Sequence, residues 1–393
     1  MSIKILHILH DEKFIDGAID TFNSTSAINT YVSIEDTKPF NRIKSHASDV
    51  LIIGRDEILS FIVSGGFQLV AFHTLTRDKY ELVLNIPKNI KVLWLSWGYD
   101  IYEPWNEMPP VLSLDLYKKE TKSFFNVPIF TRFKRLVKKI IFFKRYQKIR
   151  NDRRTLVESE VSIQKKLLAR VDYMSTVLPA EFEMLSELPE FRAKYIPFQY
   201  ANRNSFDITT AVDNVADKIL LGNSATPTNN HISVLDILRK KQITNECVLP
   251  CSYGSDEYWC YLKGKLNDYN NVCVLKDFMP YDDYVALINS CRVGIFGHLR
   301  QQAIGNILLC MCRGCKVFLY KDSIAYKYFK ESGYVIFSID DDLSQDSIDK
   351  LLTDEERLIN VSKLQSQFAF NNVVCRLEKI LNKISSNLCT DRQ

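Results

Sequence analysis

The stretch Arg300-Gln301-Gln302-Ala303-Ile304-Gly305-Asn306 carries the clearest fold signal in this chain. An apolar run at residues 293–297 precedes it, and an apolar helical pattern and a second strand-like run at residues 316–320 follow it. Strand, polar loop, helix and strand in this order place the start of a helix at the carboxyl edge of a parallel sheet. The sequence therefore predicts an α/β sheet with a polar loop at its ligand-binding edge.

This loop has the chemistry of an anion site. Backbone N–H groups and the helix dipole favour a diphosphate at a helix N-terminus, here the turn that contains Gly305. Arg300 adds a planar cation, and Gln301 and Gln302 add hydrogen-bonding side chains, which suits a nucleotide diphosphate that carries a sugar. A polar loop that only caps a structural helix is the alternative.

Composition indicates an ordinary globular protein with more than one domain. The chain has 393 residues, of which 46% are hydrophobic and 25% are charged, and one hydrophobic core rarely organises so long a chain. No apolar run is long enough to span a membrane, and residues 1–10 lack the design of a signal peptide. We therefore expect two domains and a cytoplasmic protein.

The ten cysteines all follow residue 246. They lie in apolar settings without the spacing of a disulfide framework, which indicates reduced thiols. Cys310, Cys312 and Cys315 lie close together, but no second cysteine pair and no histidine at zinc-finger spacing accompanies them. We interpret these three as small core residues.

Positive charge is concentrated in residues 132–154. This segment carries eleven Lys or Arg residues and one acid, Asp152, so its net charge is +10 within a chain total of +4. The apolar residues fall on one side of a helix, at Phe133, Leu136, Val137, Ile140 and Phe143. This pattern favours a helix on an anionic membrane surface. A solvated helix packed on its own domain is the alternative, and nucleic acid is disfavoured because no recognition motif accompanies the charge.

The rest of the chain repeats an α/β pattern in which buried strands alternate with helices or loops. The strand-like runs of the first half are residues 3–9, 50–53, 69–72, 92–95, 173–177 and 195–198. Those of the second half are residues 218–221, 247–250, 272–275, 293–296 and 317–320. The polar residues 200–205 form the predicted linker. Two doubly wound halves of this kind would place a ligand cleft at the carboxyl ends of their strands.

Polar residues gather after the first strands of the second half. Gly222 permits close backbone approach, and Asn223 and Ser224 offer hydrogen-bonding groups to a phosphate or a sugar. His231 begins a predicted helix and could either reach a phosphate or cap that helix. Tyr253 follows the next strand and could stack on a base or a sugar.

Two residues of the first half are candidates for the base that deprotonates an attacking hydroxyl. His73 and Asp100 each follow a predicted strand. A histidine can act as a base near neutral pH without a large pKa shift, and an aspartate needs only to stay ionised. Binding of acceptor hydroxyls by the same residues is the alternative.

Taken together, these motifs resemble the TDP-4-acetamido-4,6-dideoxygalactose (Fuc4NAc) transferase family. The elements in the second half are Gly222-Asn223-Ser224 with Asn229 or Asn230 and His231, the Pro250 and Tyr253 turn, Tyr284-Val285-Ala286-Leu287, and the run from Arg300 to Gly305. In the first half, His73 and Trp97-Gly98-Tyr99-Asp100-Ile101-Tyr102-Glu103 are similar to the family's HG and WGxDLYE elements. The similarity covers most of the chain, and residues 212–340 are its most specific part.

The resemblance implies a GT-B glycosyltransferase, with two Rossmann-like domains facing across a cleft. Residues 1–205, with the basic segment 132–154, would form the acceptor-side domain, and residues 206–393 would bind a TDP-sugar donor. The family acts in enterobacterial common antigen assembly. It implies transfer of 4-acetamido-4,6-dideoxygalactose or a similar deoxysugar to a polyprenyl-diphosphate-linked oligosaccharide, at the cytoplasmic face of the bacterial inner membrane.

The chain departs from the family pattern at a few positions. Thr74 follows His73 where the family has glycine, and Ala303 also replaces a family glycine. The segment from about residue 104 to 152 is longer than the family implies, so the acceptor is the least transferable part of the resemblance.

Other functions remain open from the sequence. A nicotinamide-linked oxidoreductase would also use two α/β domains, but no G-x-G-x-x-G motif follows an early strand. A non-catalytic partner of a polysaccharide synthesis complex would keep the fold and the basic segment without needing a donor site. No Asp-X-Asp motif lies in a suitable loop, and we expect neither a metal nor a cofactor.

Overall fold

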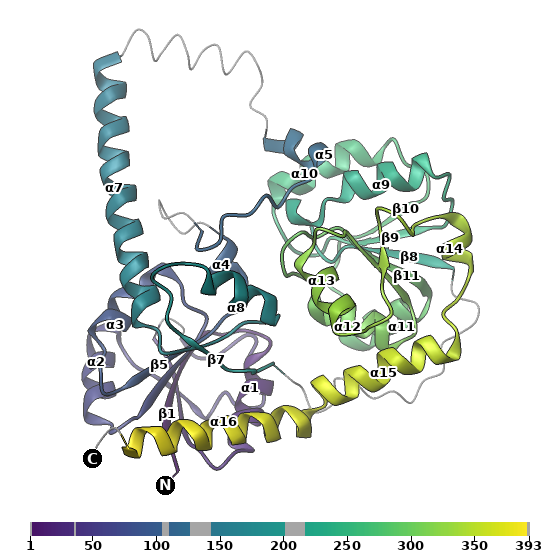
Figure 1. Cartoon of the computed structure of the whole chain (residues 1–393). Coiled ribbons are helices and arrows are strands. Elements are labelled where there is room, and N and C mark those ends of the chain that lie inside the picture. The colour runs from purple at the N-terminus through teal and green to yellow at the C-terminus, as the bar shows by residue number, and fades with distance from the viewer. Residues whose placement is uncertain (1, 35–36, 104–109, 126–142, 201–216, 391–393) are drawn as a thin grey trace. The chain divides into compact units, whose positions relative to one another are not determined.

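The computed structural model describes residues 2–34, 37–103, 110–125, 143–200 and 217–390. The chain forms two compact units, each with its own sheet (Figure 1). Unit 1 comprises Met1–Ser113, Lys144–Ser205 and Ser366–Gln393, and unit 2 comprises Leu114–Phe143 and Phe206–Gln365. One boundary between the units falls after Ser205. Residues 114–143 precede this boundary but belong to unit 2, and residues 366–393 follow it but belong to unit 1.

Unit 1 is built on a parallel sheet of seven strands in the order β3-β2-β1-β4-β5-β6-β7. The strands are β1 (Lys4–Leu9), β2 (Ile28–Ser33), β3 (Val50–Ile52), β4 (Leu69–His73), β5 (Lys91–Leu95), β6 (Tyr173–Ser175) and β7 (Lys194–Tyr195). The central strand β4 is buried along its whole length, as expected for a parallel sheet that helices cover on both faces.

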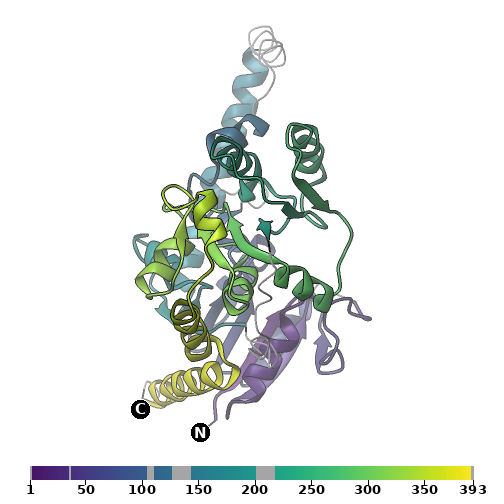
Figure 2. The same ribbon diagram turned by 90° about the vertical axis from the view of Figure 1, so that its right-hand side faces the viewer.

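The helices of unit 1 include one from the far end of the chain. They are α1 (Ile15–Asn23), α2 (Arg55–Ser64), α3 (Tyr80–Asn85), α4 (Tyr99–Tyr102), α7 (Phe143–Arg170), α8 (Pro179–Ser186) and α16 (Phe370–Thr390). Helix α16 lies beside α1 (Figure 2), and its Leu377, Leu381 and Ile384 join the core that contains Ile5 and Phe22. This apolar stripe explains why residues 366–393 belong to unit 1.

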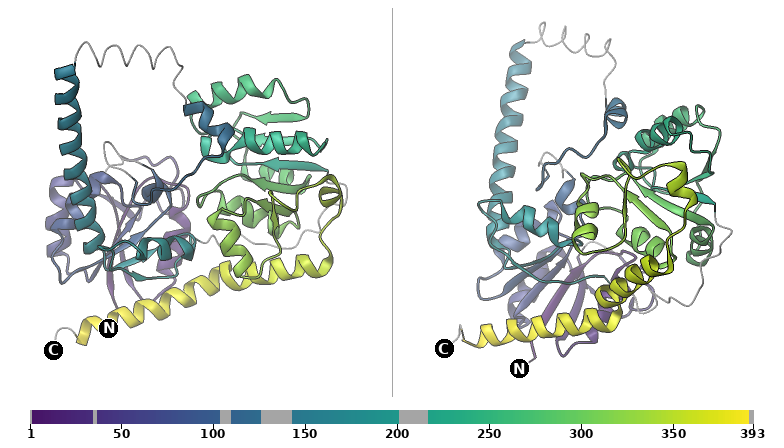
Figure 3. Two further views of the ribbon diagram at one scale, coloured as in Figure 1. Left: turned by 45° about the horizontal axis from the view of Figure 1, so that its top comes forward. Right: turned by 45° about the vertical axis from the view of Figure 1, so that its right-hand side comes forward.

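The last turns of helix α7 pack on unit 1. Leu167 and Leu168 are buried, whereas Arg153 and Arg154 are exposed, and the helix projects away from the sheet in both views of Figure 3. Residues 132–142 of the predicted basic segment and residues 201–205 of the predicted linker lie outside the described residues. No helix in the described parts of the chain has the length and apolar character needed to cross a membrane.

Unit 2 has a parallel sheet of six strands in the order β10-β9-β8-β11-β12-β13. The strands are β8 (Lys218–Leu221), β9 (Cys247–Pro250), β10 (Val272–Leu275), β11 (Cys291–Phe296), β12 (Lys316–Leu319) and β13 (Phe337–Ser338). The helices are α5 (Lys119–Lys122), α9 (His231–Lys240), α10 (Asp256–Leu266), α11 (Tyr281–Asn289), α12 (Ile304–Cys312), α13 (Ile324–Glu331), α14 (Gln345–Asp349) and α15 (Asp354–Phe368), the last of which runs on past the end of the unit.

Residues 114–125 join unit 2 through contacts with α9 and α10. Glu120 in α5 accepts a 2.7 Å hydrogen bond from Ser233, and Phe124 packs edge-on against Tyr258 with ring centres 5.3 Å apart. The carbonyl group of Leu116 accepts a hydrogen bond from the side chain of Asn230. This segment follows the first five strands of unit 1 in the sequence but forms part of the second unit.

Each predicted strand overlaps a strand of the structure, although the run at residues 195–198 does so only at Tyr195, and two further strands were not predicted. Strands β2 and β13 extend the two sheets through parallel pairing with β1 and β12. Each sheet has a point at which the strand order reverses, between β1 and β4 in unit 1 and between β8 and β11 in unit 2. Ligands of doubly wound sheets bind at the carboxyl ends of the strands beside such points.

Candidate active site

Gly222 stands where β8 ends, beside the reversal point of unit 2. Its φ of +70° is in the left-handed region, and its N–H group donates to the carbonyl oxygen of Ile295 in β11. A Cβ atom here would lie 2.4 Å from Oδ1 of Asn229 and 3.0 Å from Nε2 of His231. Only glycine therefore allows the backbone to turn so close to these two side chains.

Asn229 fixes the loop that follows Gly222. Its Oδ1 accepts from the backbone N–H of Asn223 at 3.0 Å, and its Nδ2 donates to the carbonyl oxygen of Ser224 at 2.9 Å and to Oγ1 of Thr226 at 2.8 Å. Asn229 and Ser224 are both buried. Because every side-chain polar atom of Asn229 is engaged, residues 223–226 have one defined conformation.

His298, two residues beyond β11, completes this arrangement and was not predicted from the sequence. Its Nε2 lies 2.8 Å from Oδ1 of Asn229 and 3.1 Å from Oδ1 of Asn223. Both partners are acceptors, so Nε2 carries the proton. Burial, followed by the nearby charge of Arg300, lowers the pKa of His298 well below its usual value. His298 is thus a neutral donor that holds both asparagines.

Gln302 connects Arg300 to the same network. Its Oε1 accepts from Oγ1 of Thr228 at 2.6 Å and from Nε of Arg300 at 3.2 Å. Its Nε2 donates to Oδ1 of Asn223 and to Oγ1 of Thr226, both at 3.2 Å. The structure therefore brings Arg300 and Gln302 of the loop after β11 together with the loop after β8.

Tyr253 contributes a ring to this edge of the sheet. Its hydroxyl group accepts a 2.7 Å hydrogen bond from Nδ2 of Asn223, while 55% of the residue remains exposed. The next residue, Gly254, has a φ of +130°, and a Cβ atom there would meet the Ala225 carbonyl oxygen at 2.4 Å. The ring is thus anchored at its hydroxyl group and open on its face, as stacking on a ligand requires.

His231 is the first residue of α9 and is fully buried. Its Nδ1 lies 3.2 Å from the hydroxyl group of Tyr258, and the two rings stack with centres 5.9 Å apart. Burial lowers the pKa of His231 to about 3, so the ring is neutral near pH 7. The other ring nitrogen atom of His231, Nε2, is the one close to Gly222. It has no hydrogen-bond partner among the described residues.

The N-terminus of α12 presents the backbone groups that the sequence predicted. The first N–H groups of a helix have no acceptor within the helix, and Gly305 lies in this first turn, exposed, with no atom within 4 Å of the place that a Cβ atom would occupy. Gln301 is buried beside it. The open space at Gly305 leaves room for a group to approach the helix end.

The positions at which this chain lacks the family glycines share one backbone feature. Ala303, just before α12, has a φ of +58°, and Thr74, just after β4, has a φ of +80°. Both values lie in the left-handed region that favours glycine. Each residue therefore has the backbone conformation that a glycine adopts readily, although neither is a glycine.

The reversal point of unit 1 holds a chain of hydrogen bonds rather than a free histidine. His73 is buried, with its Nδ1 2.9 Å from the hydroxyl group of Tyr200 and its Nε2 3.1 Å from Nδ1 of His7. His7 Nε2 in turn lies 3.1 Å from Oδ1 of Asn29. Since Asn29 donates from Nδ2 to the Phe22 carbonyl oxygen, His7 donates from Nε2.

The direction of the whole chain follows from this assignment. Burial lowers the pKa of His7 to about 4, so Nδ1 of its neutral ring accepts from Nε2 of His73. His73 Nδ1 then accepts from Tyr200. The pKa of His73 is well below its usual value, first because of burial and then because His7 and Lys79 are close. Both nitrogen atoms of His73 are engaged inside unit 1.

Asp100 is buried and accepts hydrogen bonds from five donors. Its Oδ2 accepts from Nε1 of Trp94 at 2.7 Å and from the backbone N–H of Leu75 at 3.1 Å. Its Oδ1 accepts from the Ser96 hydroxyl group at 3.0 Å and from the N–H groups of Trp97 and Gly98, both at 3.1 Å. In this structure Asp100 ties the loop after β5 to the loop after β4.

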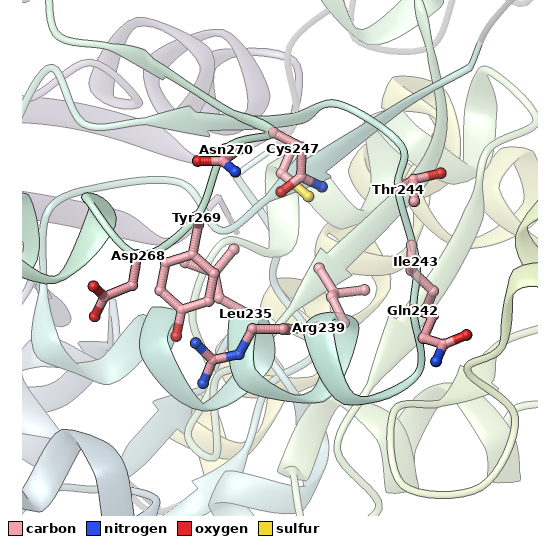
Figure 4. A pocket seen from close by; sticks show the side chains of 11 residues that line it. Leu235, Arg239, Gln242, Ile243, Thr244, Cys247, Asp268, Tyr269 and Asn270 are labelled. Atoms are coloured by element: carbon pink, nitrogen blue, oxygen red, sulfur yellow. The ribbon is translucent and has the colours of Figure 1, made fainter.

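Neither the hollow in unit 2 nor the group of cysteines adds to the site. A hollow of about 350 Å³ is lined by Leu235, Arg239, Thr244, Cys247 and Tyr269 (Figure 4), but it lies at the amino ends of β9 and β10, the edge away from Gly222. Within the described residues, no three His, Cys, Asp or Glu side chains gather in a way that could hold a metal ion. Cys310, Cys312 and Cys315 are buried in the core around α12, as predicted.

Comparison with known proteins identifies the family of this chain. The sequence profile of the 4-alpha-L-fucosyltransferase family, glycosyl transferase group 56, matches residues 186–385, about half of the chain. The chain belongs to glycosyl transferase group 56. It is therefore a glycosyltransferase that uses a nucleotide-sugar donor, and the profile covers all of the candidate-site residues of unit 2, from Gly222 to Gly305.

Solved structures show that this glycosyltransferase has the GT-B fold. A glycosyltransferase from Rickettsia africae has a TM-score of 0.60 at 12% identity and covers 98% of this chain and 99% of its own. Anabaena HepE in complex with UDP-glucose has a TM-score of 0.60 at 13% identity, over 98% of this chain and 100% of its own. Sucrose-phosphate synthase from Thermosynechococcus elongatus has the same TM-score at 10% identity, with coverage of 98% and 100%.

Proposed function

We propose that this glycosyltransferase moves 4-acetamido-4,6-dideoxygalactose, or a similar deoxysugar, from a TDP-sugar to a polyprenyl-diphosphate-linked oligosaccharide. The product would belong to a surface polysaccharide such as enterobacterial common antigen. The observation that carries the donor half of this proposal is the Gln302 bridge, because it joins Arg300 to Asn223 and Thr226. Residues from two loops thus form one preorganised group at the reversal point of the unit 2 sheet.

In this proposal the donor diphosphate lies against Arg300 and the first N–H groups of α12 near Gly305. Gly222, Asn223 and Ser224 approach it from the loop after β8, His231 offers Nε2, Gln301 lines the same loop, and the exposed ring of Tyr253 stacks on the base or the sugar. Arg300 and the helix end would stabilise the charge that develops on the leaving diphosphate. The chemistry needed from these groups is positioning and charge stabilisation.

The test combines donor binding with turnover. We expect TDP to bind in calorimetry and NAD not to bind, and we expect Arg300→Ala to lower kcat by about two powers of ten or more, the usual effect of removing one such donor. Arg300→Lys, which keeps the charge but loses the planar fork, should fall between the two. Near-normal turnover and TDP affinity in Arg300→Ala would refute the donor assignment.

The acceptor half of the proposal places the protein at a membrane. A polyprenyl-linked acceptor keeps its sugar close to the bilayer, and the net charge of +10 in residues 132–154 would hold the enzyme peripherally at the cytoplasmic face of the inner membrane. Activity with a lipid-linked oligosaccharide but not with the same free oligosaccharide would support it. Equal activity with both would remove the lipid from the proposal.

A further inference from the structure

Three carboxylates lie close together in the sequence after β1, and two of them have a structural task. Asp11 accepts from the backbone N–H groups of Arg42 and Ile43, both at 2.8 Å. Asp16 accepts from those of Lys44 at 2.9 Å and of His46 at 3.0 Å. These bonds hold residues 41–46 against the start of α1. Either carboxylate could bind a substrate only by giving up hydrogen bonds that hold this loop.

Glu12 lies between them and has no such task. It is half-buried, its backbone oxygen accepts from the N–H of Ile15, and its carboxylate forms no hydrogen bond or ion pair with any other described residue. It stands three residues beyond the end of β1, at the carboxyl edge of the sheet. Strands β1 and β4 flank the reversal point of this sheet, which is where the ligand of a doubly wound domain binds.

Aromatic rings lie beside this edge. Phe14 is 45% exposed and meets Trp97 edge-on with ring centres 5.7 Å apart. Trp97 meets Tyr200 at 5.2 Å, also edge-on, and Phe14 lies 6.4 Å from Tyr200. The three rings, which we call the Phe14 cluster, come from the loops after β1, β5 and β7. Partly exposed rings next to a carboxylate offer an apolar face to sugar C–H groups and a polar partner to a hydroxyl group.

The charge of Glu12 acts on the hydroxyl group of Tyr99, two residues beyond Trp97. Burial raises the pKa of the Tyr99 hydroxyl group, and the neighbouring charges of Asp100 and Glu12 add to this rise. Lys13 is a further charged group near Glu12, and its ammonium group lies 4.8 Å from the centre of the Phe14 ring. Glu12 thus lies within electrostatic range of the loop after β5, close to the Phe14 cluster.

We propose that Glu12 is the catalytic base of this glycosyltransferase and that the Phe14 cluster binds the acceptor sugar. This inference rests on the proposed function. The Glu12 carboxylate takes the proton of the attacking acceptor hydroxyl group, and the acceptor oxygen forms the new bond to C1 of the donor sugar. The bond from C1 to the diphosphate oxygen breaks, its electron pair leaves with the nucleoside diphosphate, and Glu12 later releases the proton to water.

Glu12 suits this role better than the two bases predicted from the sequence. Asp100 already accepts from five donors, and His73 has both nitrogen atoms engaged. A base must have a free lone pair within reach of the substrate proton. Among these three residues only the Glu12 carboxylate meets that condition, while His73 supports the Phe14 cluster through Tyr200.

The test compares Glu12→Gln and Glu12→Asp with Glu57→Gln, a matched change at an exposed position of α2. We expect Glu12→Gln to lower kcat about 10²- to 10⁴-fold, the usual contribution of a general base, with TDP affinity unchanged because the donor site lies in unit 2. Glu12→Asp should recover part of the rate, and Trp97→Ala should raise KM for the acceptor more than it lowers kcat.

The outcomes separate this inference from the proposed function. Turnover of Glu12→Gln within threefold of the wild-type rate would overturn the role of Glu12. An unchanged acceptor KM in both Trp97→Ala and Phe14→Ala would overturn the acceptor site. Absence of TDP binding by the wild-type protein would instead refute the proposed donor. Thermal unfolding of each variant shows whether a loss of rate comes from a loss of fold.

Discussion

Nε2 of His298 donates to Oδ1 of Asn229 across 2.8 Å, and the same nitrogen atom lies 3.1 Å from Oδ1 of Asn223. One imidazole thus holds the loop after β11 against the loop that follows β8. These are the strands at which the order of the unit 2 sheet reverses. The geometry of the proposed donor site therefore depends on a histidine that stands outside the predicted motif.

We predict that His298→Ala weakens both the fold and donor binding. The change removes one donor from each of two buried amide oxygens, which keep a second donor in the Asn223 N–H group and in Nε2 of Gln302, and each lost hydrogen bond costs about 0.5–1.5 kcal/mol. Urea unfolding should show the loss of stability, and calorimetry should show a TDP Kd at least about tenfold higher. His298→Gln, which keeps a donor, is the matched control and should be milder. Unchanged affinity in His298→Ala would show that the asparagines need no such clamp.

Substitution by alanine should have different effects on stability at two glycines of the proposed donor site. Gly222→Ala places a Cβ atom 2.4 Å from Oδ1 of Asn229 at a φ of +70°, so stability and TDP binding should both fall. Gly305→Ala meets no atom within 4 Å and should stabilise α12 by about 0.5–1 kcal/mol. If the diphosphate approaches this helix end, Gly305→Ala should nevertheless raise the Kd of TDP. A more stable variant with unchanged affinity would move the diphosphate away from Gly305.

Asp100→Ala is expected to destabilise unit 1 strongly. Five donors, among them the indole N–H of Trp94, would lose a charged acceptor in the interior, which should cost at least about 3 kcal/mol. Denaturant unfolding of the variant, beside Asp56→Ala at an exposed position of α2, measures this cost. A stable but inactive Asp100→Ala protein would instead support the catalytic role that the sequence motif predicts.

The stability of unit 2 should depend on pH through His231. Burial lowers its pKa from 6.5 to about 3 in the folded protein. Below pH 6.5 the unfolded chain therefore binds a proton that the folded chain does not, and the free energy of unfolding falls by up to about 1.4 kcal/mol per pH unit. Urea unfolding between pH 7 and pH 4.5 should show a shallower fall in His231→Phe.

The pKa of His46 is shifted in the direction opposite to that of His231, so His46 serves as a control for the pH dependence of stability. Burial lowers its pKa, but hydrogen bonds to Asp49 and Asp20 outweigh burial and raise the pKa overall. Its contribution is complete below pH 6.5 and is lost as the pH rises through the raised value. Equal pH dependence of the wild-type protein and His231→Phe would show that His231 is protonated in the folded state.

The basic segment predicts salt-sensitive membrane binding. Each Lys or Arg near an anionic surface contributes about 1 kcal/mol, and salt screens this attraction. The protein should sediment with anionic liposomes at low salt, and release should need high salt rather than detergent. Changing Lys138, Lys139, Lys144 and Arg145 to Glu should abolish the effect. Equal weak binding to neutral and anionic liposomes would remove the membrane role from residues 132–154.

The sequence by itself determined the two parallel sheets and located most of the polar residues that gather at the reversal point of unit 2. Runs such as residues 69–72 and 293–296 are apolar throughout, because strands buried on both faces need no polar side. Strand β2 escaped prediction since Asn29 and Thr30 interrupt its apolar residues, and β13 did so because its two residues are too short a signal. Gly222 and Arg300 were recognised because each follows a run of this kind.

Only the tertiary structure decided which polar side chains are engaged and which are free. Asp11, Glu12, Asp16 and Asp100 are all acids that follow strands, and the sequence gives no measure of the donors around each. Donors from distant segments, such as Leu75 for Asp100 and Arg42 for Asp11, settle their roles. The same holds for α16, whose apolar stripe packs on unit 1. Hydrogen bonds and packing between distant residues depend on the closed fold, which local sequence patterns do not encode.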